Sequence, residues 1–166
     1  MHRARAAVFV VAAGGALLAC GGGGSDAPEL GATSAWARPT PAGADEGVVY
    51  LTVTSDRADA VEAASVPSAI AGGAELHETM VGGADGAHHH GGGGGGGDEM
   101  ATMAPAEELA VDPATPLVFE PGGNHVMLVD LVAPLEAGER FVLTLELASG
   151  RSIDVPVVVQ VNPPGS

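Results

Sequence analysis

Histidine and methionine are concentrated in one stretch of the chain, and both residue types can bind metal ions. Beyond the first 20 residues, all five histidines and all four methionines lie between residues 77 and 127. Imidazole and thioether donors without a thiolate form a soft to intermediate ligand set, which suits Cu(I) better than Zn(II) or hard cations. The full set is His77, Met80, His88, His89, His90, Met100, Met103, His125 and Met127.

The triplet His125-Val126-Met127 has the most informative spacing. Residues i and i+2 of a strand lie on the same face, so the two donors can point at one ion. The preceding Pro121-Gly122-Gly123 is a turn signal, which places the pair near an end of a strand. The alternative is that Met127 belongs to the core and His125 is a capping or surface residue.

The first 20 residues have the layout of an export signal. A basic segment, MHRAR, precedes an apolar run that is too short for a typical membrane-spanning helix. The run ends in Leu17-Leu18-Ala19-Cys20, which resembles a bacterial lipobox. We therefore predict a signal peptide over residues 1–19, lipidation of Cys20, and a flexible Gly/Ser tether over 20–33. The alternative is an ordinary signal peptide with a coincidental cysteine.

Composition and charge exclude several classes of function. Cys20 is the only cysteine, so its lipidation leaves no thiolate metal site and no disulfide in the mature domain. The net charge of −15 provides no basic surface for nucleic acid and favours cationic partners or metal ions. The glycine run at 91–97 lacks the Lys-Ser/Thr of a phosphate-binding loop, and the paired acids are typical of a solvated surface. We expect a protein that is not an enzyme.

The hydrophobic pattern predicts an all-β domain, a sandwich or barrel. Strand signals occur at 48–54, 72–80, 107–112, 116–120 and 121–132, and the segment 59–66 fits either a strand or a short helix. Two strongly alternating segments, ERFVLTLEL and RSIDVPVVVQV, flank a plausible hairpin turn. No segment has a sustained helical period, and many short strands are typical of a sandwich or barrel. Residues 162–166 are expected to be a disordered tail.

The chain resembles the periplasmic copper chaperones called PCu(A)C. Members carry a His, then a Met, then 21 residues and His-x-Met, and here 21 residues separate Met103 from His125-Val126-Met127. The segments AWARPTPAG, GVVYLTV, AELHETM, PLVFEPGGNHVMLVDL and PLEAGERFVLTLEL also resemble the family. The resemblance covers about residues 34–161, which we take as the copper-binding domain.

The resemblance implies both a fold and a site. The fold would be a cupredoxin-like Greek-key β-barrel, and one Cu(I) would be bound by two His and two Met. Carried over by position, these ligands are His77, Met103, His125 and Met127. The implied partner is the copper-site subunit of cytochrome c oxidase or one of its assembly factors, and a monomer is expected.

One departure from the family concerns the stretch AHHHGGGGGGGDEMATM. His77 and Met103 are 26 residues apart, farther than the corresponding pair in the family, and the surplus matches the Gly/His tract. We interpret residues of about 84–97 as a loop insertion, which loop-closure entropy tolerates. It leaves Met100 as a competitor of Met103, although the 21-residue spacing favours Met103. An accessory Cu(II) site at His88, His89, His90 and Met100 is one interpretation, and low-complexity drift is the other.

These observations predict an exported Cu(I) chaperone, anchored by lipid at the outer face of the cytoplasmic membrane or in the periplasm. The same ligands would serve a copper-sequestering or resistance lipoprotein that buffers copper instead of donating it. A blue-copper electron carrier is disfavoured, because that site needs a thiolate.

Overall fold

The computed structural model describes residues 29–81 and 101–165, and in these two ranges it contains ten strands and no helix. The segment 59–66 is therefore a strand, as one of its two interpretations predicted. The strands are β1 (Gly31–Ala37), β2 (Glu46–Thr54), β3 (Asp59–Ser65), β4 (Ala71–Val81), β5 (Ala101–Pro105), β6 (Leu109–Val111), β7 (Leu117–Phe119), β8 (His125–Leu131), β9 (Arg140–Leu147) and β10 (Ser152–Val159).

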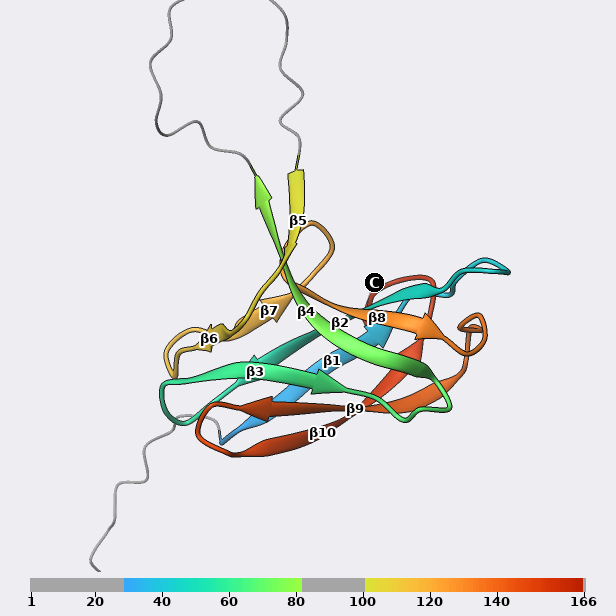
Figure 1. The fold of residues 1–166 in the computed structure, drawn as a ribbon. Helices are drawn as coiled ribbons and strands as arrows, with labels where there is room; N and C mark the ends of the chain where they lie inside the picture. The colour runs from blue at the N-terminus through green and yellow to red at the C-terminus, as the bar shows by residue number, and fades with distance from the viewer. Residues whose placement is uncertain (1–28, 82–100, 166) are drawn as a thin grey trace, which may run out of the picture.

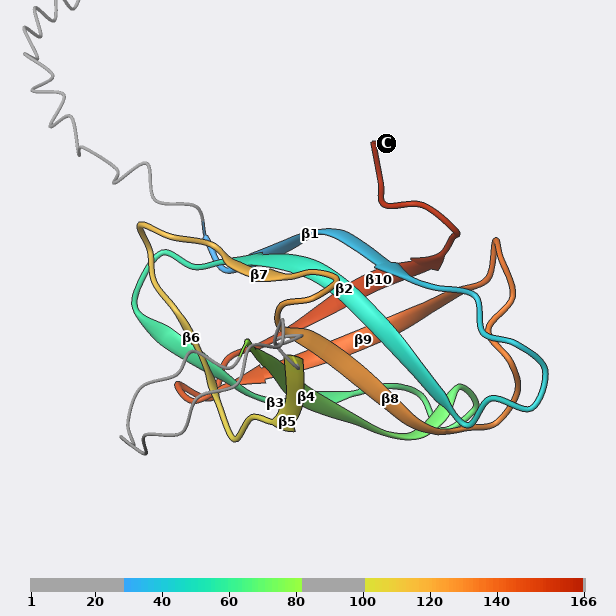
Figure 2. The ribbon, with the colours of Figure 1, turned by 90° about the horizontal axis from the view of Figure 1, so that it is seen from above.

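Seven of these strands close into a barrel (Figures 1 and 2). Their order is β4-β8-β2-β1-β10-β9-β3, and β3 returns to β4 through the pair Ala64 and Ala74. The strands β1 and β10 pair in parallel, whereas the other neighbours in the barrel are antiparallel. The prediction of an all-β barrel is confirmed.

Strand alternation fills the barrel interior with aliphatic side chains. In β9, Phe141, Leu143, Leu145 and Leu147 are buried, whereas Val142 between the first two is 42% exposed. The same period of two applies to β8, where Val126 and Leu128 are fully buried. The residues next to them in sequence must therefore project from the outer face of the barrel.

The strands β4 and β5 continue beyond the barrel as a two-stranded arm (Figure 1). They pair from His77 opposite Pro105 to Val81 opposite Ala101. The Gly/His tract is thus the connection between two paired strands. The predicted insertion, with His88, His89, His90 and Met100, lies outside the described residues, as do Cys20 and the signal peptide.

The start of the domain differs slightly from the expected boundary. The strand β1 begins at Gly31, within the segment assigned to the tether, and Ala32 and Thr33 pair with Val53 and Thr52 of β2. The composition of this segment did not reveal its pairing partner. Across 29–81 and 101–165, no helix is long and apolar enough to cross a membrane.

One polar cluster ties two connections of the barrel together. The Arg151 guanidinium, on the β9–β10 hairpin, donates to Asp56 at 2.8 Å and to Asp59 at 2.9 Å. Asp59 also accepts from the Ser149 hydroxyl at 2.6 Å, and its side chain is only 3% exposed. Hydrogen bonds from Ser149 and Arg151 hold the pKa of the Asp59 carboxyl well below its usual range.

Candidate metal site

Strand register places the four predicted ligands on one face of three adjacent strands. His77 of β4 lies directly opposite His125 of β8, and two residues along the same strands Glu75 lies opposite Met127. On the other side of β4, Thr79 lies opposite Met103 of β5. Diagonal neighbours on one face of a sheet are about 7–8 Å apart, within reach of long side chains. Both thioethers can therefore approach the space beside the two imidazoles.

The two histidine rings are in close proximity. Their centroids are 5.5 Å apart and the ring planes are inclined at 44°. His125 is only 4% exposed, and the side chain of His77 is 13% exposed. The strands thus bring together two imidazoles that are 48 positions apart in the sequence and largely screened from solvent.

The hydrogen bond of His125 identifies which of its nitrogens is free. Its Nδ1 lies 3.0 Å from the carbonyl oxygen of Gly123, which can only accept a hydrogen bond. Nδ1 must therefore carry the proton, and in the neutral ring Nε2 keeps its lone pair. This arrangement, with one ring nitrogen donating to a backbone carbonyl, is common among histidines that bind metals through the other nitrogen.

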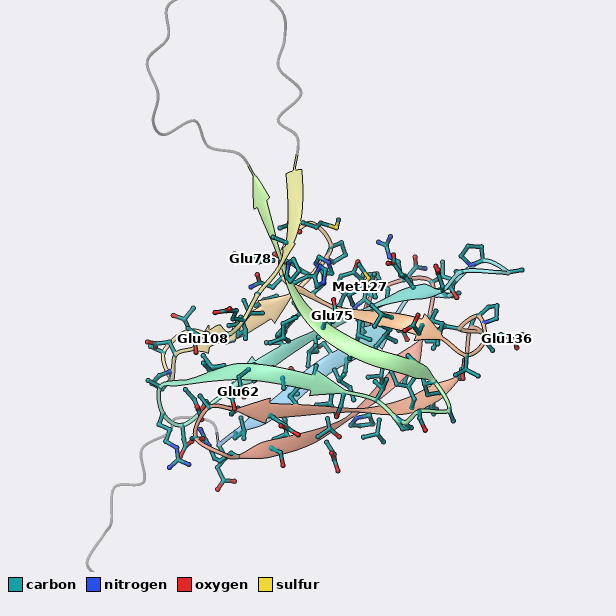
Figure 3. All side chains as sticks on the ribbon, in the orientation of Figure 1. Glu62, Glu75, Glu78, Glu108, Met127 and Glu136 are labelled. Atoms are coloured by element: carbon teal, nitrogen blue, oxygen red, sulfur yellow. The ribbon has the colours of Figure 1, made fainter. Side chains whose placement is uncertain are left out.

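His77 has the opposite arrangement. Its Nε2 lies 3.2 Å from Oε2 of Glu75, so in the neutral ring Nε2–H donates a hydrogen bond to this carboxylate oxygen and the lone pair is on Nδ1. Figure 3 labels Glu75 close to Met127, which lies opposite it in the register. Glu75 is thus in contact with one imidazole and beside one thioether.

The nitrogens that these bonds leave free are both buried, and neither has a hydrogen-bond partner among the residues that the structure describes. They are Nδ1 of His77 and Nε2 of His125. A buried polar atom without a partner costs about 1–3 kcal/mol, so native proteins rarely keep one without a reason. Two such lone pairs on facing rings fit a cation with nitrogen ligands.

The two methionines differ in exposure. Met127 is half-buried on β8, whereas Met103 is 60% exposed on the arm. Within residues 29–81 and 101–165, no three His, Cys, Asp or Glu side chains are grouped as a metal site. The register therefore leaves two thioethers within reach of two adjacent imidazoles, a combination that suits Cu(I).

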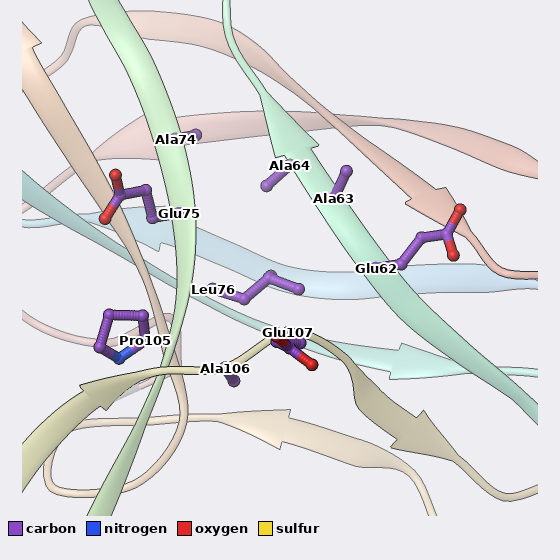
Figure 4. A pocket seen from close by; sticks show the side chains of 9 residues that line it. All are labelled: Glu62, Ala63, Ala64, Ala74, Glu75, Leu76, Pro105, Ala106 and Glu107. Carbon is purple, nitrogen blue, oxygen red and sulfur yellow. The ribbon is translucent and has the colours of Figure 1, made fainter.

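The sequence predicted these four positions but missed three residues that surround them. Strand alternation alone would have placed Glu75 on the same face as His77. Glu75 also lines a shallow pocket of about 390 Å³ at the seam between β3 and β4 (Figure 4). The roles of Thr79 and Gly123 depend on the pairing of β4 with β8, which a single sequence does not reveal.

Comparison with known proteins identifies the family. Residues 30–159 match the LpqE-like lipoproteins. The chain belongs to the LpqE-like lipoprotein family. A curated lipoprotein, Lxx21020 of Leifsonia xyli subsp. xyli, is 46% identical over 44 residues. That match spans about a quarter of either protein, 26% of this chain and 26% of the relative.

Solved structures similar to this LpqE-like chain are PCuAC domains and a copper protein. The copper-bound PCuAC domain from PmoF2 is 18% identical with a TM-score of 0.58, covering 83% of this chain and 97% of that domain. The solution structure of Cu(I)-bound DR1885 from Deinococcus radiodurans is 26% identical with a TM-score of 0.56, covering 86% and 84%. These likenesses confirm the predicted cupredoxin-like fold.

Proposed function

We propose that this LpqE-like protein is an exported, lipid-anchored carrier of Cu(I). One ion would be held by His77, Met103, His125 and Met127 and passed to a partner by ligand exchange. The observation that carries this proposal is the pair of facing imidazoles whose buried Nδ1 and Nε2 atoms have no hydrogen-bond partner within residues 29–81 and 101–165. The similar structures in copper-bound form support the choice of metal.

The exposure of the ligands fits transfer. Met103 is 60% exposed, so a donor group of a partner can reach it before the buried His125. Thioethers are neutral at all pH values, so only the two imidazoles couple Cu(I) binding to pH. Acidification through the range in which imidazole protonates should therefore release copper. A Cu(I) affinity that stays constant between pH 5 and 8 would argue against histidine coordination.

The recipient and the anchor remain proposals that follow from resemblance. The partner would be the copper-site subunit of cytochrome c oxidase or one of its assembly factors. Cys20, in the lipobox-like sequence, would carry the lipid that holds the protein at the outer face of the cytoplasmic membrane or in the periplasm. Membership of a lipoprotein family supports this location.

A copper buffer is the second candidate, because the same ligands would serve storage. The His-rich run favours this alternative slightly, since adjacent imidazoles bind Cu(II) well. A deletion strain separates the two functions. A chaperone predicts oxidase deficiency that added copper relieves, whereas a buffer predicts copper sensitivity with normal oxidase.

The first test is an anaerobic Cu(I) titration against a competing chelator. We expect one tight equivalent for the wild-type chain and its loss in His125→Ala/Met127→Ala. The control is Val129→Ala, which shortens a half-buried side chain two residues further along β8 and should retain the equivalent. Tight binding that survives the double substitution would place the metal elsewhere and overturn the assignment.

The accessory Cu(II) site remains a prediction from sequence. Deletion of residues 88–97 removes the three histidines and the glycine run together. A lower Cu(II) stoichiometry with an unchanged Cu(I) equivalent is expected if the run binds metal. An unchanged Cu(II) stoichiometry would favour low-complexity drift.

A further inference from the structure

The carbonyl oxygen of Gly123 accepts hydrogen bonds from side chains on two different strands. The Thr79 hydroxyl of β4 donates to it at 3.0 Å, and Nδ1–H of His125 on β8 donates at 3.0 Å. A carbonyl oxygen has two lone pairs and can accept both bonds. Thr79 and His125 are thus joined through one backbone atom.

The direction of this carbonyl determines which tautomer His125 adopts. A carbonyl aimed at Nδ1 requires the proton there, which leaves the Nε2 lone pair free in the buried space beside His77. A neutral histidine side chain in water favours the other tautomer, with its proton on Nε2. The Gly123 carbonyl must therefore offset that preference for His125 to present a lone pair at Nε2.

The turn that carries this carbonyl has a permissive backbone. It contains Gly122, whose φ is +84°, followed by Gly123. The amide of Gly123 donates to the Glu120 carbonyl at 3.0 Å, which holds one side of the residue. Glycine has few steric limits on its dihedral angles, so the direction of its carbonyl depends on the bonds it accepts. The Thr79 hydroxyl supplies one of these bonds from outside the turn.

Thr79 also lies between Met103 and His125, two of the proposed ligands. It pairs with Met103 across the β4–β5 arm and bonds to the turn that orients His125. Its side chain is on the same face of β4 as His77, two residues away. The Thr79 hydroxyl therefore links β4, the strand that carries His77, with the carbonyl that orients the buried imidazole of His125.

We propose that Thr79 is a positioning residue for the copper site. Its hydroxyl fixes the Gly123 carbonyl, which holds His125 in the Nδ1–H tautomer with Nε2 free to bind the ion. The effect on affinity rests on the proposed Cu(I)-binding function, whereas the effect on the tautomer concerns the protein without metal. Residues that orient a ligating histidine typically change metal affinity by about 10–100-fold when replaced.

The test compares three variants of the full chain. Thr79→Val removes the hydroxyl but keeps a β-branched shape that suits a strand. Thr79→Ser restores the hydroxyl and is the rescue variant. Thr144→Val is the matched control, because Thr144 on β9 also donates its hydroxyl to an acceptor, Asp154 at 2.7 Å, within the described barrel.

Two measurements are made on each variant. The ring ¹⁵N chemical shifts of His125 in the metal-free protein at neutral pH report the tautomer, and an anaerobic chelator competition reports Cu(I) affinity. We expect Thr79→Val to populate the Nε2–H tautomer of His125 and to weaken Cu(I) binding by about 10-fold or more. Thr79→Ser and Thr144→Val should match the wild type in both measurements.

The outcomes separate this proposal from the proposed function. An unchanged His125 tautomer in Thr79→Val would overturn the positioning role, as would an equal loss of affinity in Thr79→Ser. Failure of the wild type to bind Cu(I) would overturn the copper function, while the tautomer measurement would still test Thr79. If Thr79→Val does not fold, Thr79→Ala removes the same hydroxyl and is judged by the same two results.

Discussion

His77 and His125 face each other across β4 and β8, and each ring has one buried nitrogen with no hydrogen-bond partner in the described part of the chain. Their other nitrogens are engaged by Glu75 and by the Gly123 carbonyl. The metal-free site therefore carries a cost of desolvation, of about 1–3 kcal/mol for each unsatisfied atom. The energetic consequence is that the site should oppose stability without copper and favour it with copper.

The first prediction concerns His77→Leu in the metal-free protein. The substitution removes the unpartnered Nδ1 and loses only a hydrogen bond to a carboxylate whose side chain is 53% exposed, which contributes little. We expect the free energy of unfolding to stay equal to that of the wild type or to rise by about 1 kcal/mol. Urea unfolding at neutral pH in the presence of a chelator measures this, with Glu78→Gln on the same strand as the control. A loss of several kcal/mol would show that the imidazole stabilises the fold by itself.

The second prediction concerns the same variant in the presence of copper. A ligand that binds only the folded state stabilises it, by about 2.7 kcal/mol at a free concentration one hundred times Kd. We expect anaerobic Cu(I) to raise the Tm of the wild type and of Glu78→Gln, and removal by a chelator to reverse the change. The Tm of His77→Leu should not respond. An equal copper-dependent increase in that variant would mean that stabilisation arises outside the His77 site.

The face on which a side chain lies could be predicted from the sequence, whereas contacts between distant strands could not. The alternation of Phe141, Leu143, Leu145 and Leu147 determines a strand with one buried face, and the structure has it. The triplet His125-Val126-Met127 likewise determines a shared face, because the period of a strand is two. By contrast, the contact between Thr79 and Gly123 depends on the register of two strands that are distant in sequence.

The start of β1 illustrates the same limit. Gly31, Ala32 and Thr33 have the composition of a tether, yet they pair with Thr54, Val53 and Thr52. Their strand conformation follows from the neighbouring β2 and not from their own propensity, because glycine and alanine are poor strand formers. The pairing with β2 therefore determines the strand conformation of residues 31–33, which their local sequence does not predict.

The third prediction concerns acid stability at the Arg151 cluster. Hydrogen bonds from Ser149 and Arg151 lower the pKa of Asp59 in the folded state, so the unfolded chain binds the proton more tightly. The stabilisation is therefore present above the unfolded pKa, near 3.9, and is lost progressively as the pH falls below about 5. We expect Asp59→Asn to lower the urea midpoint at pH 7 and to reduce its dependence on pH between about 5 and 2.

A matched comparison for this cluster is Asp56→Asn. Asp56 contacts the same guanidinium, but its side chain is 43% exposed, compared with 3% for Asp59. Solvent screening weakens an exposed pair, so we expect a smaller loss at pH 7 for Asp56→Asn. Equal losses for both variants would show that burial of Asp59 does not strengthen its interactions.

The fourth prediction tests whether the alternation in β9 determines the core energetics. Leu143 is 0% exposed inside the barrel, and its neighbour Val142 is 42% exposed on the outer face. Leu143→Ala leaves a cavity in a closed barrel and should destabilise the protein by about 2–5 kcal/mol. Val142→Ala removes exposed methyl groups and should cost about 0.5 kcal/mol or less.

Chemical denaturation of the two β9 variants measures this difference. The slope of the free energy of unfolding against denaturant concentration is compared between them. Both substitutions place alanine on the same strand, and the loss of the β-branched Val142 carries the larger cost in β-propensity, so propensity works against the expected difference. A large difference therefore reports burial itself. Similar costs for Leu143→Ala and Val142→Ala would mean that β9 does not present its leucine face to the core, and the barrel register through β3 and β10 would have to be revised.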